Sequence, residues 1–73
     1  MKAEVYAPIT GTVWKVHVQE GELVEQGQTC ITLESMKMEI PVDAPHRGQI
    51  TTILHTYGAF VSQGDVLFTL FLE

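Results

Sequence analysis

The chain consists of two related halves. Shifting the sequence by 37 residues places residues 7–36 on residues 44–73 without a gap. Nine of the thirty aligned positions are identical, and each of the six glycines has a glycine partner in the other half. A unit this small cannot bury its own apolar face, so the two copies must cover each other. The repeat therefore predicts two similar units related by a pseudo-twofold axis.

Each half has the composition of short β-strands. Prolines and the repeated glycines divide the chain into short segments rich in Val, Ile, Thr and Phe, and apolar residues alternate along several of them. The predicted strands cover residues 3–7, 12–18, 23–25, 29–34, 38–43, 49–55, 60–62 and 66–72. We therefore expect one all-β domain over residues 1–73, a flattened antiparallel sandwich or barrel of two four-stranded sheets.

Several residues are assigned structural roles. Alternation fails along residues 12–18, and a β-bulge is the simplest repair. The paired glycines are interpreted as turn positions with positive φ. Cys30 aligns with Leu67 and is expected to be a buried hydrophobic residue. Aromatic residues are expected to pack in the core or at its rim, namely Trp14, Phe60 and Phe68.

Composition and charge exclude several classes of function. The 45% hydrophobic and 18% charged content is that of a globular chain. Nine acidic and four basic residues give a formal charge of −5, which argues against nucleic acid as a partner. No apolar run is long enough for a membrane span or a signal peptide, so a cytoplasmic protein is expected, and the net negative charge suits a monomer. The histidines lack the spacing of a metal site, and no serine has a nearby base, so no metal and no catalytic residue is predicted.

The junction between the halves departs from local turn preferences. The strand at 29–34 must reverse into the strand at 38–43 through Ser35-Met36-Lys37. Tight hairpins favour Asn-Gly or Asp-Gly, because their central residues have positive φ. Such a departure is expected mainly at functional sites, and an exposed hairpin tip presents its side chains to other proteins.

The chemistry available at this junction is that of a lysine amine, which forms a stable amide with a carboxylate-bearing cofactor. The chain has three lysines, of which Lys2 is terminal and Lys15 lies in a predicted strand. Lys37 belongs to neither repeat copy and lies between two methionines, whose flexible side chains offer contact surface to a modifying enzyme. Lys37 is therefore the candidate attachment point.

The segment Glu34-Ser35-Met36-Lys37-Met38-Glu39 resembles the attachment motif of biotin carrier domains in the biotinyl/lipoyl family. The resemblance covers essentially the whole chain. It includes Ala-Pro-x-x-Gly at 7–11 and 44–48 and Gly-x-x-Val-x-x-Gly at 21–27 and 58–64. It implies a barrel-sandwich hybrid fold without the inserted thumb of some bacterial carriers, because residues 13–28 hold no insertion. Ser35 stands where alanine is more usual.

The resemblance also implies a function. A biotin–protein ligase attaches biotin to Lys37, and the ligase or the carboxylase sites recognise Met36 and Met38, with weaker contributions from Glu34, Ser35 and Glu39. The attached biotin carries carboxylate between a biotin carboxylase site and a carboxyltransferase site, and the domain itself is not an enzyme. A tether makes the second encounter intramolecular.

Two other hypotheses remain at this point. The first is a lipoyl carrier, or an acceptor of both cofactors, because lipoyl domains also tend to have an acidic residue three positions before the lysine. Lipoyl domains usually have Asp before the lysine and Ala after it, whereas this chain has Met36 and Met38. The second is an unmodified interaction module that binds its partner through the hairpin.

Overall fold

The computed structural model describes residues 1–72, which form eight β-strands and no helix. The strands are β1 (Lys2–Tyr6), β2 (Gly11–Val16), β3 (Leu23–Val24), β4 (Thr29–Ser35), β5 (Met38–Asp43), β6 (Gly48–Ile53), β7 (Phe60–Val61) and β8 (Val66–Leu72). The predicted all-β fold is confirmed. Within residues 1–72 no helix could cross a membrane. Glu73, the last residue of the predicted domain and second half, lies outside the described residues.

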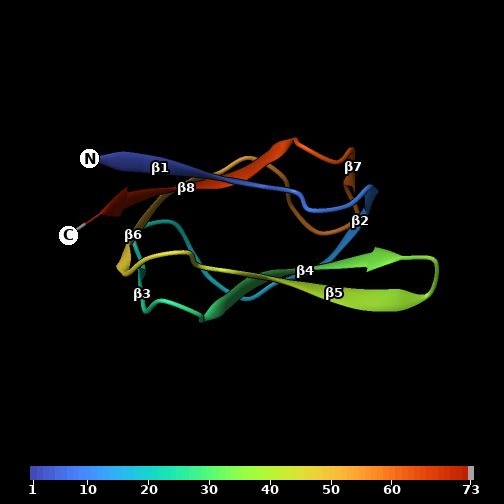
Figure 1. Cartoon of the computed structure of the whole chain (residues 1–73), viewed down its shortest axis with the longest axis horizontal. Helices are drawn as coiled ribbons and strands as arrows, with labels where there is room; N and C mark the ends of the chain where they lie inside the picture. The colour runs from blue at the N-terminus through green and yellow to red at the C-terminus, as the bar shows by residue number, and fades with distance from the viewer. Residues whose placement is uncertain (73) are drawn as a thin grey trace.

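The strands form two antiparallel sheets with matching topology. Their orders are β1-β8-β6-β3 and β5-β4-β2-β7. Replacing each strand by its partner in the repeat converts one order into the other, as a pseudo-twofold axis requires. The domain measures 35 × 17 × 17 Å, with the β4–β5 hairpin at one end of the long axis and the start of β1 at the other (Figure 1).

The core lies between the two sheets and is built from repeat pairs. Val13 and its partner Ile50 are fully buried, and so are Leu33 and its partner Leu70. Cys30 and Phe68 are also fully buried, as the sequence predicted. The prediction for Phe60 is wrong: it lies on the outer face of edge strand β7 and is 69% exposed.

The predicted bulge is present and occurs twice. The register of β2 against β4 shifts between Val13 and Lys15, which leaves Trp14 as the extra residue. The register of β6 against β8 shifts at the equivalent place, between Ile50 and Thr52. The bulge is therefore a property of the repeat, and it turns the side chain of Trp14 out of the core.

Two of the six glycines do not have the predicted role. Four have positive φ, between 85° and 93°, namely Gly21, Gly27, Gly58 and Gly64. Gly11 and Gly48 instead lie against a neighbouring backbone, where a Cβ would overlap the carbonyl oxygen of Glu34 or of Phe71, respectively. These two positions require glycine for close approach and not for an unusual φ.

Candidate functional site: the hairpin between β4 and β5

The hairpin that presents Lys37 is tighter than the sequence indicated. Ser35 is the last residue of β4 and pairs with Met38, the first residue of β5. The turn therefore consists of Met36 and Lys37 alone, whereas the prediction included Ser35 in it. A two-residue connection fixes the register of the hairpin, so it holds both turn residues in defined positions.

The backbone at the tip adopts the conformation that normally calls for Asn-Gly. Met36 has φ 53° and Lys37 has φ 66°, and they are the only non-glycine residues with positive φ within residues 1–72. This left-handed region costs an L-residue with a Cβ roughly 1–2 kcal/mol. Six register pairs between β4 and β5 hold the turn closed against that cost.

The side chains at the tip are exposed. Met36 is 91% exposed and Met38 is 64% exposed, so neither fills a gap in the core. Lys37 is also exposed, and its side chain forms no hydrogen bond or ion pair with any residue in 1–72. The tip thus presents one amine between two apolar, flexible side chains, a surface that suits protein contact.

The two other lysines lie in different environments. The ammonium of Lys15 lies 4.8 Å from the centroid of the Trp14 ring, a cation–π contact on β2. Lys2 begins β1, at the end of the domain opposite the hairpin (Figure 1). Lys37 is therefore the lysine that combines an exposed tip with an unpaired amine.

The residues that flank the turn lie on two faces. Glu34 and Glu39 are directly opposite each other on β4 and β5, and both are exposed. Like charges in this arrangement destabilise a sheet, so the fold does not explain the pair. Ser35 is half-buried beside the close approach of Gly11 to β4.

Titratable groups elsewhere do not form a second reactive centre. Burial raises the pKa of the Cys30 thiol to about 11, which keeps it protonated and unreactive. His17 Nε2 lies 2.8 Å from Thr32 Oγ1, and His55 Nδ1 donates a hydrogen bond to the carbonyl of Val66 at 3.1 Å. Residues 1–72 contain no cluster of three potential metal ligands.

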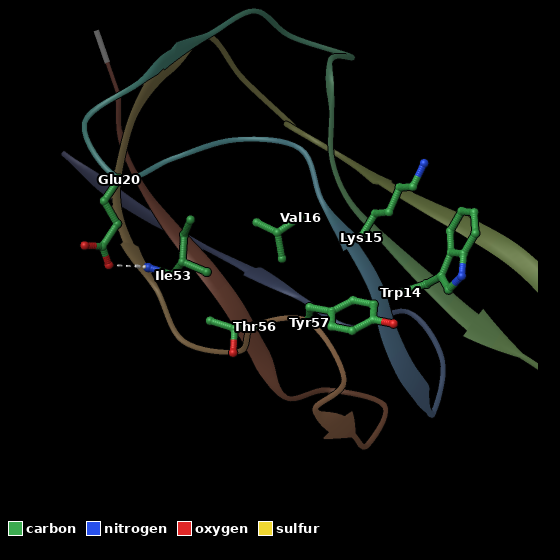
Figure 2. A pocket seen from close by; sticks show the side chains of 7 residues that line it. All are labelled: Trp14, Lys15, Val16, Glu20, Ile53, Thr56 and Tyr57. Atoms are coloured by element: carbon green, nitrogen blue, oxygen red, sulfur yellow. Dashed lines mark hydrogen bonds between the residues drawn. The ribbon is translucent and has the colours of Figure 1, made fainter.

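A groove beside β2 was not predicted. It has a volume of about 840 Å³ and is lined by Trp14, Lys15, Val16, Glu20, Ile53, Thr56 and Tyr57 (Figure 2). Val16 and Ile53 are partners in the repeat, as are Glu20 and Tyr57, so the groove lies where the two halves meet. An alignment of the two halves could have indicated the groove, because two aromatic residues, Trp14 and Tyr57, replace the polar residues Thr51 and Glu20 of the other half.

Comparison with known proteins places this architecture in a family. The profile of the biotin/lipoyl family, described as "Biotin-requiring enzyme", matches residues 1–70. A biotin/lipoyl attachment protein of Bacillus subtilis is 47% identical over 62 residues, which cover 85% of this chain and 85% of that protein. The biotin carboxyl carrier protein of acetyl-CoA carboxylase from Solanum lycopersicum is 42% identical over 66 residues, which cover 90% of this chain and 94% of that protein.

Other matches are parts of much longer proteins. The alpha3 subunit of a biotin-dependent acyl-coenzyme A carboxylase from Mycobacterium leprae is 48% identical, over 86% of this chain and 10% of that one. A solved structure of a single-chain, multi-domain long-chain acyl-CoA carboxylase superposes with a TM-score of 0.93 at 30% identity, over 99% of this chain and 7% of that one. The chain thus belongs to the biotinyl/lipoyl carrier domain family, as a biotin carrier domain and not a catalytic one.

Proposed function

We propose that Lys37 is the residue to which biotin is attached. The observation that carries the proposal is the two-residue turn in which Met36 and Lys37 both have positive φ and project into solvent. The fold tolerates an unfavourable backbone there without any packing in return. A requirement for a lysine at the outermost point of the domain explains that choice.

The attachment reaction uses the free amine described above. A biotin–protein ligase activates the carboxylate of biotin as an acyl adenylate: a carboxylate oxygen attacks the α-phosphorus of ATP, and pyrophosphate leaves as the α–β phosphoanhydride bond breaks. The deprotonated Nζ of Lys37 attacks the acyl carbon, a C–N amide bond forms, and AMP leaves with the C–O bond electrons. The amine loses its positive charge, so the formal net charge changes from −5 to −6.

The remainder of the domain acts as a rigid holder. The tip lies at one end of a 35 Å axis, so Lys37 enters a partner's active site while the two sheets stay outside. When bound, biotin carries a carboxylate between a biotin carboxylase site and a carboxyltransferase site. The tether makes each encounter effectively intramolecular. Carboxylases among the relatives support this assignment of partners.

The methionines are proposed as recognition residues for the ligase and the carboxylase sites. Their exposure of 91% and 64% supports this role, because buried methionines would have only a packing role. Glu34, Ser35 and Glu39 contribute less, as the side chains at the base of the tip. The domain acts in this proposal as a monomer, because the exposed tip must reach each partner in turn.

Lipoate is the second candidate for the attached group, because the name of the Bacillus subtilis relative includes both cofactors. Incubating the unmodified protein with biotin, ATP and a biotin–protein ligase, and separately with lipoate, ATP and a lipoate ligase, distinguishes them by intact mass. Complete conversion to the biotinyl mass is expected. Conversion by the lipoate ligase alone would transfer the assignment to lipoate, and no adduct in either reaction would support an unmodified interaction module.

A further inference from the structure

We propose that the groove beside β2 is a resting site for the biotinyl group of Lys37 between visits to partner active sites. The inference rests on the attachment proposed above. It makes the carrier more than a passive holder, because the domain itself shields the bicyclic ring of biotin from solvent. The residues that argue for it are Trp14, Lys15 and Tyr57.

Comparing the two halves of the repeat distinguishes residues that the fold requires from residues that it does not require. Residues kept in both halves, such as the core pair Leu33 and Leu70, are explained by packing. The bulge occupied by Trp14 is occupied in the other half by Thr51, and Tyr57 corresponds to Glu20. The fold therefore does not require aromatic residues at these two positions.

The asymmetry occurs in the sheet that carries the hairpin. Trp14 and Lys15 lie on β2, which pairs with β4, the strand that leads to the tip. Tyr57 lies next to Gly58, whose N–H donates to the carbonyl of Val13 at 2.8 Å, so the loop holding Tyr57 is attached to β2. Figure 2 shows Trp14 and Lys15 at one end of the groove and Glu20 at the other.

The groove matches the chemistry of biotin. The rings of Trp14 and Tyr57 provide surface for a thioether-containing bicycle at the end of the groove nearer the hairpin, and Val16 and Ile53 continue the apolar lining beyond them. The urea edge of biotin has a carbonyl acceptor and N–H donors. Lys15, which follows Trp14 on β2, supplies a donor to that carbonyl. Glu20 lies at the other end of the groove, where its Oε2 accepts a hydrogen bond from the N–H of Ile53 at 2.9 Å, and it does not contact the same ring.

The arm of Lys37 is long enough. Thr12 lies across from Glu34, so Lys37 is three residues beyond that pair and Trp14 is two residues in the opposite direction. Five steps at ~3.3 Å give at most about 17 Å along the strands. An extended biotinyl-lysine chain spans roughly 14 Å to its ring at the rise per bond of an extended backbone, and the indole extends from β2 into the remaining gap.

The test uses Trp14, the only tryptophan in the chain, as the reporter. Protein whose complete biotinylation is verified by intact mass is compared with unmodified protein by acrylamide quenching of Trp14 fluorescence. A short tether gives an effective concentration in the millimolar range, so a site with a Kd of about 1 mM is occupied about half of the time. We expect the quenching constant to fall by about half on biotinylation.

Three variants make the result specific. In Lys37→Gln, which removes the charge without adding a ring, quenching should match the unmodified protein. In biotinylated Tyr57→Ala, protection of Trp14 should shrink, whereas biotinylated Leu23→Ala, which removes an exposed apolar side chain in the other sheet, should keep it. Equal quenching of modified and unmodified wild-type protein would overturn the resting site. Absence of the mass increment would instead overturn the proposed attachment.

Discussion

Gly11 lies against the main-chain carbonyl of Glu34, at the base of the hairpin that presents Lys37. The repeat places Gly48 in the same relation to the carbonyl of Phe71, at the other end of the domain. The Gly11 contact therefore holds the hairpin in position, whereas the equivalent Gly48 contact lies away from the hairpin. Such a pair separates the effect of stability from the effect of hairpin geometry.

Gly11→Ala and Gly48→Ala should each destabilise the fold by about 1–3 kcal/mol, because the added methyl group overlaps a backbone that must shift. Urea unfolding monitored by circular dichroism measures this. Biotinylation by the ligase should slow severalfold in Gly11→Ala and stay near the wild-type rate in Gly48→Ala, under conditions where both are folded. Equal slowing in both variants would mean that stability, and not hairpin position, sets the rate.

Met36→Asn should stabilise the protein by about 0.5–1 kcal/mol, because Asn tolerates the left-handed conformation better and so recovers part of what it costs Met36. The same change should raise the KM of the ligase, since an exposed recognition side chain is lost. Met38→Asn is the matched control. It removes an exposed methionine from a strand position with ordinary φ, so it should weaken recognition without stabilising the fold. A destabilised Met36→Asn would contradict the account of the turn.

Cys30 should give the protein a pH-dependent stability. Burial raises the pKa of its thiol from 9.0 to about 11, so the unfolded chain loses the proton first as the pH rises. The contribution is complete below about pH 9 and is lost as the pH approaches 11. Urea midpoints measured across that window should fall, and Cys30→Val should reduce the slope.

Tyr6 must be separated from this effect. Its hydrogen bond to the carboxylate of Glu4, together with the nearby negative charge, raises the pKa of the phenol and changes stability in the same direction at high pH. Tyr6→Phe removes that contribution. A slope that disappears in Tyr6→Phe and persists in Cys30→Val would show that the thiol is not the responsible group.

The sequence predicted most of the architecture because most residues that the two halves share have a single structural role, either in the core or in a turn. Core pairs such as Val13 and Ile50 specify a buried face, and the break in alternation near Trp14 predicted the bulge that both halves contain. The positive φ at Met36 and Lys37 agrees with the predicted departure from turn preferences, although the turn itself does not include Ser35, as the prediction did. Local patterns were sufficient where each half supplies its own information.

What the sequence did not predict depends on contacts between residues that are distant in the sequence. Gly11 was interpreted as a turn residue, because in the sequence it looks no different from Gly21. Only the packed structure shows that the carbonyl of Glu34 lies against it. Phe60 was expected to pack, but β7 is a two-residue edge strand whose outer face has nothing to cover it. The groove combines side chains from β2, from β6 and from the β2–β3 and β6–β7 connections, so no local pattern describes it.

We expect Lys37 alone to accept biotin. Wild-type protein and the charge-conserving variants Lys2→Arg, Lys15→Arg and Lys37→Arg are incubated with biotin, ATP and a biotin–protein ligase, and their intact masses are measured. We expect one biotinyl group on the wild type, on Lys2→Arg and on Lys15→Arg, and none on Lys37→Arg. A biotinyl adduct on Lys37→Arg, or a wild-type chain that gains no mass, would contradict it.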